Sequence, residues 1–231
     1  MPSSHDENGL DEAPPSMAPS SILRELPVTE RGLRTRRALV SAARTVFERS
    51  GYLDTRLADI TREAKCSSGT FYTYFSSKEE IFAAVLEMVQ EDMLHPGMPH
   101  VADDDDPAAV IEASNRAYLE AYRRNAKLMG LLEQVANIDP VFRVLRQRRA
   151  DTFIRRNARS IADLQKRGLA DDAVNPLLAS RALSGMISRL AFAQFVGDAE
   201  QEPERDEQVS MDELVEAVTR LWVNALQIPR R

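Results

Sequence analysis

The chain has 231 residues, of which 43% are hydrophobic and 29% charged, with a net charge of -6 and a single cysteine. That length suffices for one large domain or two small ones, and one cysteine excludes an intramolecular disulfide framework. The net charge is unlike that of a nucleic-acid-binding protein, but residues 31–78 hold ten basic and four acidic side chains, a local charge of +6. A cationic surface is therefore expected there. The cysteine content and the absence of a signal-peptide pattern predict a cytoplasmic location.

Residues 1–28 are rich in proline, serine and acidic residues, which predicts a disordered acidic tail; a solvated extension is favoured over a partner-binding segment. A helix is predicted from about Glu30 to Arg49, with Gly51 as its C-terminal stop. Arg34, Arg36 and Arg37 lie in its first turns, outside the apolar stripe. Their position fits a solvated helix face, or contacts to a phosphate backbone. The stripe consists of Leu39, Ala42, Ala43, Val46 and Phe47.

The stretch from Leu57 to Lys78 predicts two short helices joined by a turn. The first helix carries one stripe at i, i+3, i+4 and i+7, formed by Leu57, Ile60, Thr61 and Ala64. Lys65 and Cys66 then break the pattern, and Ser67 is a suitable N-cap for the second helix.

In the second helix, Phe71 and Phe75 fall on one side at about 100° per residue. The opposite side has no bulky side chain, and Tyr72 and Tyr74 lie on its flanks. Such a helix can approach base edges in the major groove while its phenols meet phosphates on either side. The alternative is a short core helix whose tyrosines are incidental. The slim side consists of Gly69, Thr70 and Thr73.

The pattern G-Y-x-x-T-x-L-x-D-I-x-x-x-A at residues 51–64 is followed by S-x-G-T-F-Y-x-Y-F-x-S-K-E at residues 67–79. With these motifs, the stretch from about Arg34 to Leu86 resembles the TetR family of transcriptional regulators. The resemblance implies a homodimer with one helix-turn-helix per subunit and a larger helical domain that binds an effector. Two departures matter: Lys65-Cys66 stands at a turn that is usually Gly and an aliphatic residue, and Tyr74 stands where His is frequent.

The residue pattern and the resemblance together predict the side chains that meet DNA. Thr55 is expected to be the N-cap of the first short helix, where its amide or hydroxyl holds a phosphate. The predicted DNA contacts are Arg34, Arg36, Thr55, Lys65, Ser67, Ser68, Gly69, Thr70, Tyr72, Thr73, Tyr74 and Lys78.

A capping box at residues 77–80 predicts a helix to about Met93, which can act as a lever between the DNA-binding part and the rest. Two histidines and four aspartates follow, at His95, His100 and residues 103–106. Two prolines and a glycine separate the histidines, whereas metal ligation favours a rigid element. We therefore predict an acidic linker and no metal.

Proline and capping residues divide the remainder into helices near 107–127, 128–137, 140–167, 176–196 and 211–227. No hairpin or alternating strand pattern is present, so the predicted class is all-α. It combines an N-terminal three-helix helix-turn-helix domain (29–78) with a C-terminal helical domain for effector binding and dimerisation (79–231). The apolar stretch 176–196 is long enough for a membrane span, but Arg181 and Arg189 argue against one. We expect the last two helices to form a four-helix bundle across a two-fold axis.

The effector pocket is expected to be largely apolar. Bulky residues on inward-facing helices are the candidates, although each could equally belong to the core. Seven arginines between Arg143 and Arg159 could form a second nucleic-acid surface or meet an anionic effector, but a solvated or salt-bridged face is favoured. The effector candidates are Tyr122, Met129, Phe142, Phe153, Met186 and Phe192.

The expected function is that of a ligand-responsive transcriptional regulator, a repressor that leaves its DNA operator when a small effector binds. An architectural DNA-binding protein without an effector is the first alternative. An enzyme is less favoured, because no catalytic triad order, phosphate loop, paired histidines or nucleotide fingerprint is visible. No cofactor is expected.

Overall fold

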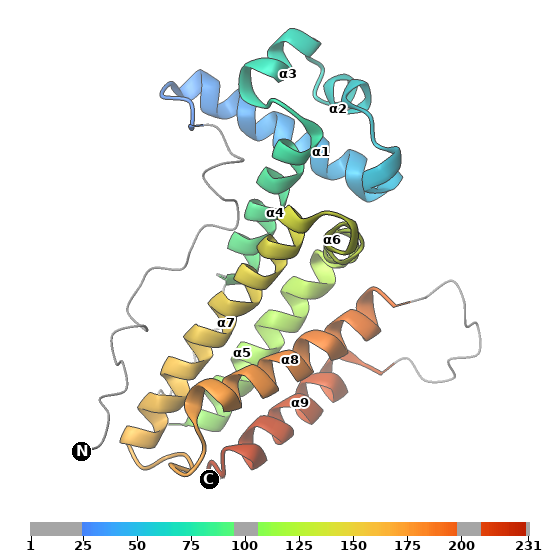
Figure 1. Ribbon diagram of the computed structural model, residues 1–231. Helices are drawn as coiled ribbons and strands as arrows, with labels where there is room; N and C mark the ends of the chain where they lie inside the picture. The colour runs from blue at the N-terminus through green and yellow to red at the C-terminus, as the bar shows by residue number, and fades with distance from the viewer. Residues whose placement is uncertain (1–24, 95–105, 198–208, 230–231) are drawn as a thin grey trace. The chain divides into compact units, whose positions relative to one another are not determined.

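The computed structural model describes residues 25–94, 106–197 and 209–229, and every regular element in these ranges is a helix. The all-α prediction is thus confirmed. Most of the predicted tail and the histidines of the predicted linker lie outside these ranges. The helices in Figure 1 are α1 (Glu30–Asp54), α2 (Leu57–Glu63), α3 (Ser68–Tyr74), α4 (Lys78–Leu94), α5 (Pro107–Arg124), α6 (Ala126–Ile138), α7 (Pro140–Lys166), α8 (Pro176–Phe195) and α9 (Met211–Ala225).

The described residues fall into two compact units. The first, called here the HTH unit, contains α1 to α4, α6 and the start of α7 up to Arg149. The second, the helical unit, contains α5 up to Arg123, α7 from Ala150 onward, α8 and α9. The HTH unit is larger than the predicted domain 29–78, because α4 and α6 pack with α1. The functional boundary at residue 78 stays a prediction.

The predicted helix ends coincide with capping interactions. The Asn175 side chain accepts a hydrogen bond from the Leu178 amide at 3.0 Å, and Ser210 forms a capping box with Glu213. Gly168 follows α7 with a positive φ of 68°, a conformation that glycine commonly adopts just after the end of a helix. Gly51 also has a positive φ, of 74°, but the chain resumes a helical turn after it, so the predicted stop is a kink within α1.

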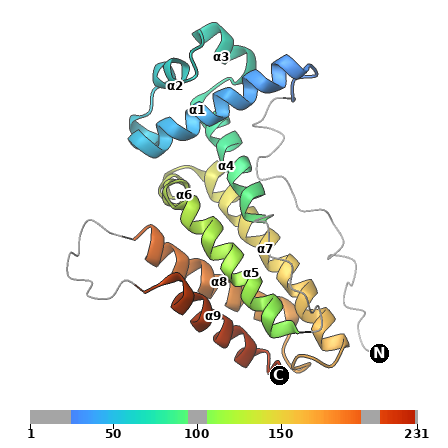
Figure 2. The same ribbon diagram turned by 180° about the vertical axis from the view of Figure 1, so that it is seen from behind.

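In the helical unit, α8 and α9 run side by side in both views (Figures 1 and 2). Their contact is apolar: Ala179 and Leu183 of α8 are buried against Trp222 and Val223 of α9, with Ile161 of α7 in the same cluster. Within the described ranges, no helix combines the length and hydropathy that crossing a membrane requires.

Two arginines of the basic helix α7 have structural roles in the HTH unit. The Arg143 guanidinium donates to the carbonyls of Ala136 and Asn137, at 3.3 and 3.4 Å, and so caps the end of α6. Arg146 forms an ion pair with Glu133 of α6 at 2.5 Å. These contacts agree with the favoured salt-bridged face.

Candidate DNA-binding interface

Helix α3 is seated by two phenylalanines. Phe71 and Phe75 are both fully buried, and their ring centroids lie 5.9 Å apart. The Ser67 hydroxyl caps the helix by accepting a hydrogen bond from the Thr70 amide at 3.1 Å, as the sequence predicted. The strand propensity of this aromatic segment is overridden by the cap and by the burial of one side.

The side of α3 opposite the phenylalanines is open. Ser68, Gly69 and Thr73 are exposed, and Thr70 is half-buried. A Cβ atom added to Gly69 would meet only the Ser67 hydroxyl oxygen, at 3.7 Å, so nothing within the subunit requires a glycine there. On the flanks, the Tyr72 side chain is 52% exposed and Tyr74 is half-buried.

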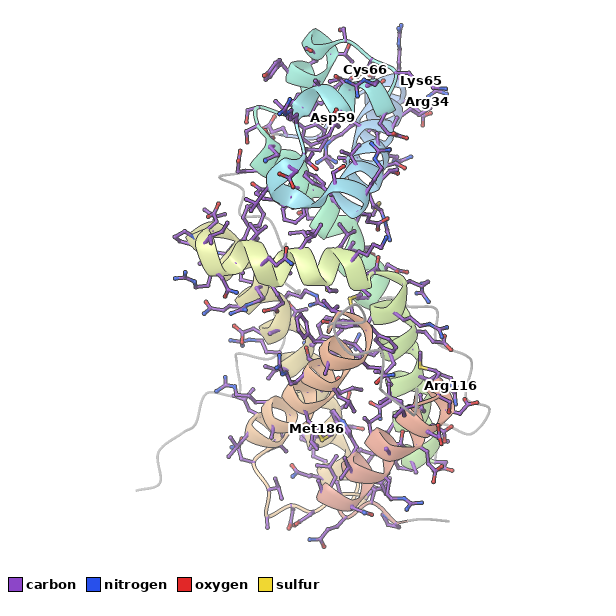
Figure 3. All side chains as sticks on the ribbon, turned by 90° about the vertical axis from the view of Figure 1, so that its right-hand side faces the viewer. Arg34, Asp59, Lys65, Cys66, Arg116 and Met186 are labelled. Carbon is purple, nitrogen blue, oxygen red and sulfur yellow. The ribbon has the colours of Figure 1, made fainter. Side chains whose placement is uncertain are left out.

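The turn between α2 and α3 contains Lys65 and Cys66 (Figure 3). Lys65 adopts the left-handed conformation, with φ of 53°. The amides of Lys65 and Cys66 donate to the carbonyls of Arg62 and Thr61, at 3.1 and 3.0 Å, which is the hydrogen-bond pattern of a Schellman motif. The departure from glycine therefore leaves the usual helix-ending geometry intact. Burial raises the pKa of the Cys66 thiol, which fits a turn residue better than a nucleophile.

Replacing Lys65 by glycine is expected to stabilise the protein. A side chain in the left-handed region costs roughly 1–2 kcal/mol, and the greater freedom of glycine in the unfolded chain offsets part of that gain, leaving about 1 kcal/mol. Urea denaturation of Lys65→Gly and wild type measures this difference. If the exposed Lys65 ammonium also contacts DNA, the more stable variant binds DNA more weakly, and its affinity falls less steeply as salt is raised.

The arginines at the start of α1 do not share one environment. Arg34 is exposed, whereas the Arg36 guanidinium is half-buried and lies 5.2 Å over the Phe75 ring. Burial lowers the pKa of Arg36, against the opposing influence of Glu87 and Glu80. We therefore correct the prediction for Arg36: its side chain packs on the anchor of α3 instead of facing outward.

Arg31 and Arg37, which are not in the set of predicted DNA contacts, are exposed near Arg34. The helical period could have separated these residues. Arg36 stands three and four residues before the buried Leu39 and Val40, so it lies on their side of α1. Arg37 is rotated away from that side.

Thr55 and Lys78 are directed into the subunit. Thr55 is buried, and its hydroxyl donates to the Gly51 carbonyl at 2.5 Å. The N-cap of α2 is Arg56, whose amide donates to the Asp59 carboxylate at 3.3 Å, so the predicted cap at Thr55 is wrong by one residue.

The Lys78 ammonium donates to three carbonyls at the end of α1, those of Tyr52, Leu53 and Thr55, at 2.9, 3.4 and 3.2 Å. It also lies 4.6 Å over the Tyr52 ring. These contacts hold the end of α1 against the start of α4. Lys78 therefore has a structural role at that junction, and its contact with a phosphate stays a prediction.

The six predicted effector residues are divided between the units. Met129 and Phe142 are buried in the HTH unit, where the Phe142 ring lies 5.2 Å from that of Phe82 and 6.0 Å from that of Tyr52. Those two are core residues of the HTH unit, which corrects their assignment to a pocket in the C-terminal domain. The other four belong to the helical unit: Tyr122 and Phe153 are buried, and Met186 (Figure 3) and Phe192 are half-buried.

The metal hypothesis concerned His95, His100 and residues 103–106, which, apart from Asp106, lie outside the described residues. The described residues contain no group of three or more His, Cys, Asp or Glu side chains able to hold a metal ion. Asp106 caps α5 instead, because its carboxylate accepts from the Ala108 amide at 3.0 Å.

Comparison with known proteins agrees with this geometry. Residues 39–85 match the family model described as bacterial regulatory proteins of the tetR family. The chain is 43% identical over 49 residues to YfiR of Bacillus subtilis (strain 168), an uncharacterized HTH-type transcriptional regulator; the match covers 21% of this chain and 24% of YfiR. It is 39% identical over 57 residues to the A-factor receptor protein of Streptomyces griseus, covering 25% and 21% of the two chains. The HTH-type transcriptional repressor NicS of Pseudomonas putida is 39% identical over 56 residues, with 24% and 26% covered.

The matched stretches span only about a quarter of these relatives' lengths. The fold similarity extends further. The crystal structure of a TetR-family transcriptional regulator from Pectobacterium atrosepticum superposes with a TM-score of 0.63 and 24% identity, over 85% of this chain and 96% of that one. Residues 39–85 therefore form a DNA-binding segment of the kind found in bacterial regulatory proteins of the TetR family, and most of the chain shares the fold of a TetR-family regulator.

Proposed function

We propose that the protein binds duplex DNA sequence-specifically, with α3 in the major groove. One observation carries this proposal: the two phenylalanines of α3 are fully buried while the side with Gly69 and Thr73 is open to a partner. A short helix with one anchored and one slim side is what direct readout of base edges requires. The local charge of +6 over residues 31–78 supplies attraction to phosphates.

The test is selection of duplexes by the purified protein from a randomised pool, followed by footprinting at two salt concentrations. A defined protected sequence is the expected result. Thr70→Ala and Thr73→Ala should change the preferred bases, whereas Tyr72→Phe should weaken binding to every sequence by about tenfold, since the phenol is expected to contact a phosphate, which carries no sequence information. Binding that shows no sequence preference would favour the architectural alternative.

We propose that the protein acts as a homodimer through α8 and α9. The two half-sites of its DNA operator would then lie about 34–36 Å apart. Support comes from an uncovered face of α8: Leu178, Ala182 and Gly185 are exposed and follow one another at helical spacing, and Leu221 of α9 is 49% exposed. A Cβ atom added to Gly185 would meet nothing within 4 Å. A mid-helix glycine costs about 1 kcal/mol relative to alanine, so an advantage from outside the subunit is expected, namely close approach of a second copy.

Gly185→Arg is expected to weaken the dimer while leaving the subunit folded. The long side chain projects from the uncovered face and holds the two α8 helices apart, so the dimer dissociation constant should rise at least about tenfold. Sedimentation equilibrium measures it. Gly185→Ala is the matched control: it should keep the dimer and raise subunit stability by about 1 kcal/mol. An unchanged dissociation constant in the Arg variant would place the interface elsewhere.

We further infer that the regulator is a repressor released by a small, largely apolar effector bound in the helical unit. The names of two relatives, a receptor protein and a repressor, support the two parts of this inference. The aromatic side chains of Tyr118, Tyr122, Phe153 and Phe195 form a chain of ring contacts there, with centroids 5.7–6.4 Å apart. Thermal stabilisation by members of a small-molecule panel, together with release from the selected duplex, tests this inference; an architectural protein would show neither. A cytoplasmic location follows from the DNA partner.

A further inference from the structure

Three helices of the HTH unit meet at one buried asparagine. Asn125, at the junction of α5 and α6, has no exposed side-chain surface. Its Oδ1 accepts a hydrogen bond from Arg44 of α1 at 3.0 Å, and its Nδ2 donates to Asp92 of α4 at 2.8 Å. Arg124 reinforces the contact, because its guanidinium donates to the other oxygen of Asp92 at 3.1 Å. Arg44 is itself held by Glu48 at 2.9 Å.

Asn125 occupies the N-cap position of α6 without capping that helix. An asparagine at an N-cap normally accepts a hydrogen bond from an amide of the first turn, an interaction worth about 1 kcal/mol. Here the side chain makes no such bond, and its backbone angles (φ -111°, ψ 13°) differ from the extended conformation of a capping residue. The Asn125 side chain thus forms hydrogen bonds to α1 and α4 in place of the bond that would stabilise the first turn of α6.

We infer that Asn125 is a positioning residue for DNA binding: with Asp92 and Arg44 it ties the α5–α6 junction to α1 and α4. This inference rests on the proposed function. Because α1 packs on α2, and α4 begins directly after α3, a displaced junction changes how α3 is held. An effector that moves α5 or α6 would therefore act on the DNA-binding helices through these bonds, as a difference in affinity between two states.

The charges at the junction agree with this role. Burial tends to raise the pKa of Asp92, but hydrogen bonds from Asn125 and Arg124 and the charges of Arg124 and Arg44 outweigh it, so the net pKa is lowered. A lowered folded-state pKa means that the carboxylate stabilises the fold at neutral pH. That contribution is lost only as the pH falls below the ordinary aspartate value and through the lowered one.

The experiment exchanges the side-chain amide of Asn125 and the carboxylate of Asp92. Asn125→Asp places a second carboxylate beside Asp92, and the double variant Asp92→Asn/Asn125→Asp again pairs one amide with one carboxylate. Asn137→Asp, on the exposed end of α6, adds the same charge away from the junction and is the matched control. Each protein is titrated with the duplex selected by wild type, its unfolding is followed in urea, and its amide hydrogen exchange is compared with and without that duplex.

Asn125→Asp is expected to weaken DNA binding about tenfold or more, and the exchange of groups to restore most of it. In wild type, DNA should also slow exchange at the Met129 amide, which donates to the Asn125 carbonyl at 3.0 Å. That distant protection should vanish in Asn125→Asp while protection of α3 remains. If Asn125 contributes to stability alone, the variant should unfold at a lower urea concentration, with its DNA affinity and its DNA-dependent protection of the Met129 amide both unchanged.

Should Asn125→Asp fail to fold, Asn125→Ser replaces it. A serine is too short to reach Arg44 and Asp92 and adds no charge beside the Asp92 carboxylate, so the variant should fold and lose the coupling. Wild-type affinity and Met129 protection in the folded junction variants would overturn the inference. A wild-type protein that selects no duplex would overturn the proposed function, and this inference with it.

Discussion

Phe71→Ala is expected to lower the free energy of unfolding of the HTH unit by about 3–5 kcal/mol, the usual cost of removing a fully buried phenylalanine ring. The ring has no exposed surface and contacts Phe75 and Tyr72, with centroids 5.9 and 5.5 Å away. Because α3 has seven residues and buries Phe71 alone, no other side chain within it can replace this anchor. DNA binding should therefore be lost, because α3 is no longer held in place by the Phe71 ring.

The measurement needs to separate the two units. Urea denaturation followed by far-ultraviolet circular dichroism reports both, whereas fluorescence of Trp222, the single tryptophan, reports the helical unit. If the unfolding midpoint falls more by circular dichroism than by Trp222 fluorescence, the lost stability belongs to the HTH unit. Tyr72→Ala is the control, since it removes a similar ring from the exposed flank and should cost below about 1 kcal/mol. Equal losses in the two variants would contradict the anchoring role of Phe71.

The sequence was sufficient for the parts of the site that depend on local periodicity. Phe71 and Phe75 are four residues apart, so any helix through them must place both on one side, and Ser67 fixes where that helix starts. The Ser77 cap of α4 was predictable in the same way: its hydroxyl accepts from the Glu80 amide at 3.2 Å. The reciprocal bond differs, because the Glu80 carboxylate accepts from Ser76, one residue earlier, at 2.6 Å.

Side chains whose partners are distant in the sequence were not predictable. Lys78 has a long flexible stem, and only the folded structure shows that the carbonyls ending α1 lie within its reach. Thr55 has a good capping side chain, but the chain already turns into α2 one residue later. Phe142 was assigned to an effector pocket because it is bulky and helical. Periodicity cannot distinguish a pocket wall from the core of a neighbouring unit, where Phe142 packs on Phe82.

A polar side chain at the end of a helix illustrates the same limit. Asn125 follows Arg124 in a stretch that reads as one continuous helical segment, so the break between α5 and α6 was predicted later than it occurs. The bonds that stabilise the break come from α1 and α4, about 81 and 33 residues away. Residues that join helices in this way become visible only once the helices are assembled.

Gly69→Gln is expected to reduce affinity for the selected duplex by about 100-fold, or roughly 2.7 kcal/mol, without loss of stability. Glutamine favours helix over glycine by about 0.5–1 kcal/mol, so the subunit should become slightly more stable if anything. A Cβ atom added at Gly69 has only the Ser67 hydroxyl near it, at 3.7 Å, and Gly69 is exposed, so the glutamine side chain is expected to extend away from the subunit. Binding is measured by fluorescence anisotropy, and stability by urea denaturation of the same preparations.

Gly69→Ala serves as the graded control, since a single methyl group should reduce affinity less than the long side chain does. Measuring both quantities separates an interface from a core: reduced affinity with unchanged stability places the added side chain against a partner outside the subunit. Wild-type affinity in Gly69→Gln would show that this side of α3 does not lie against DNA, however exposed it is.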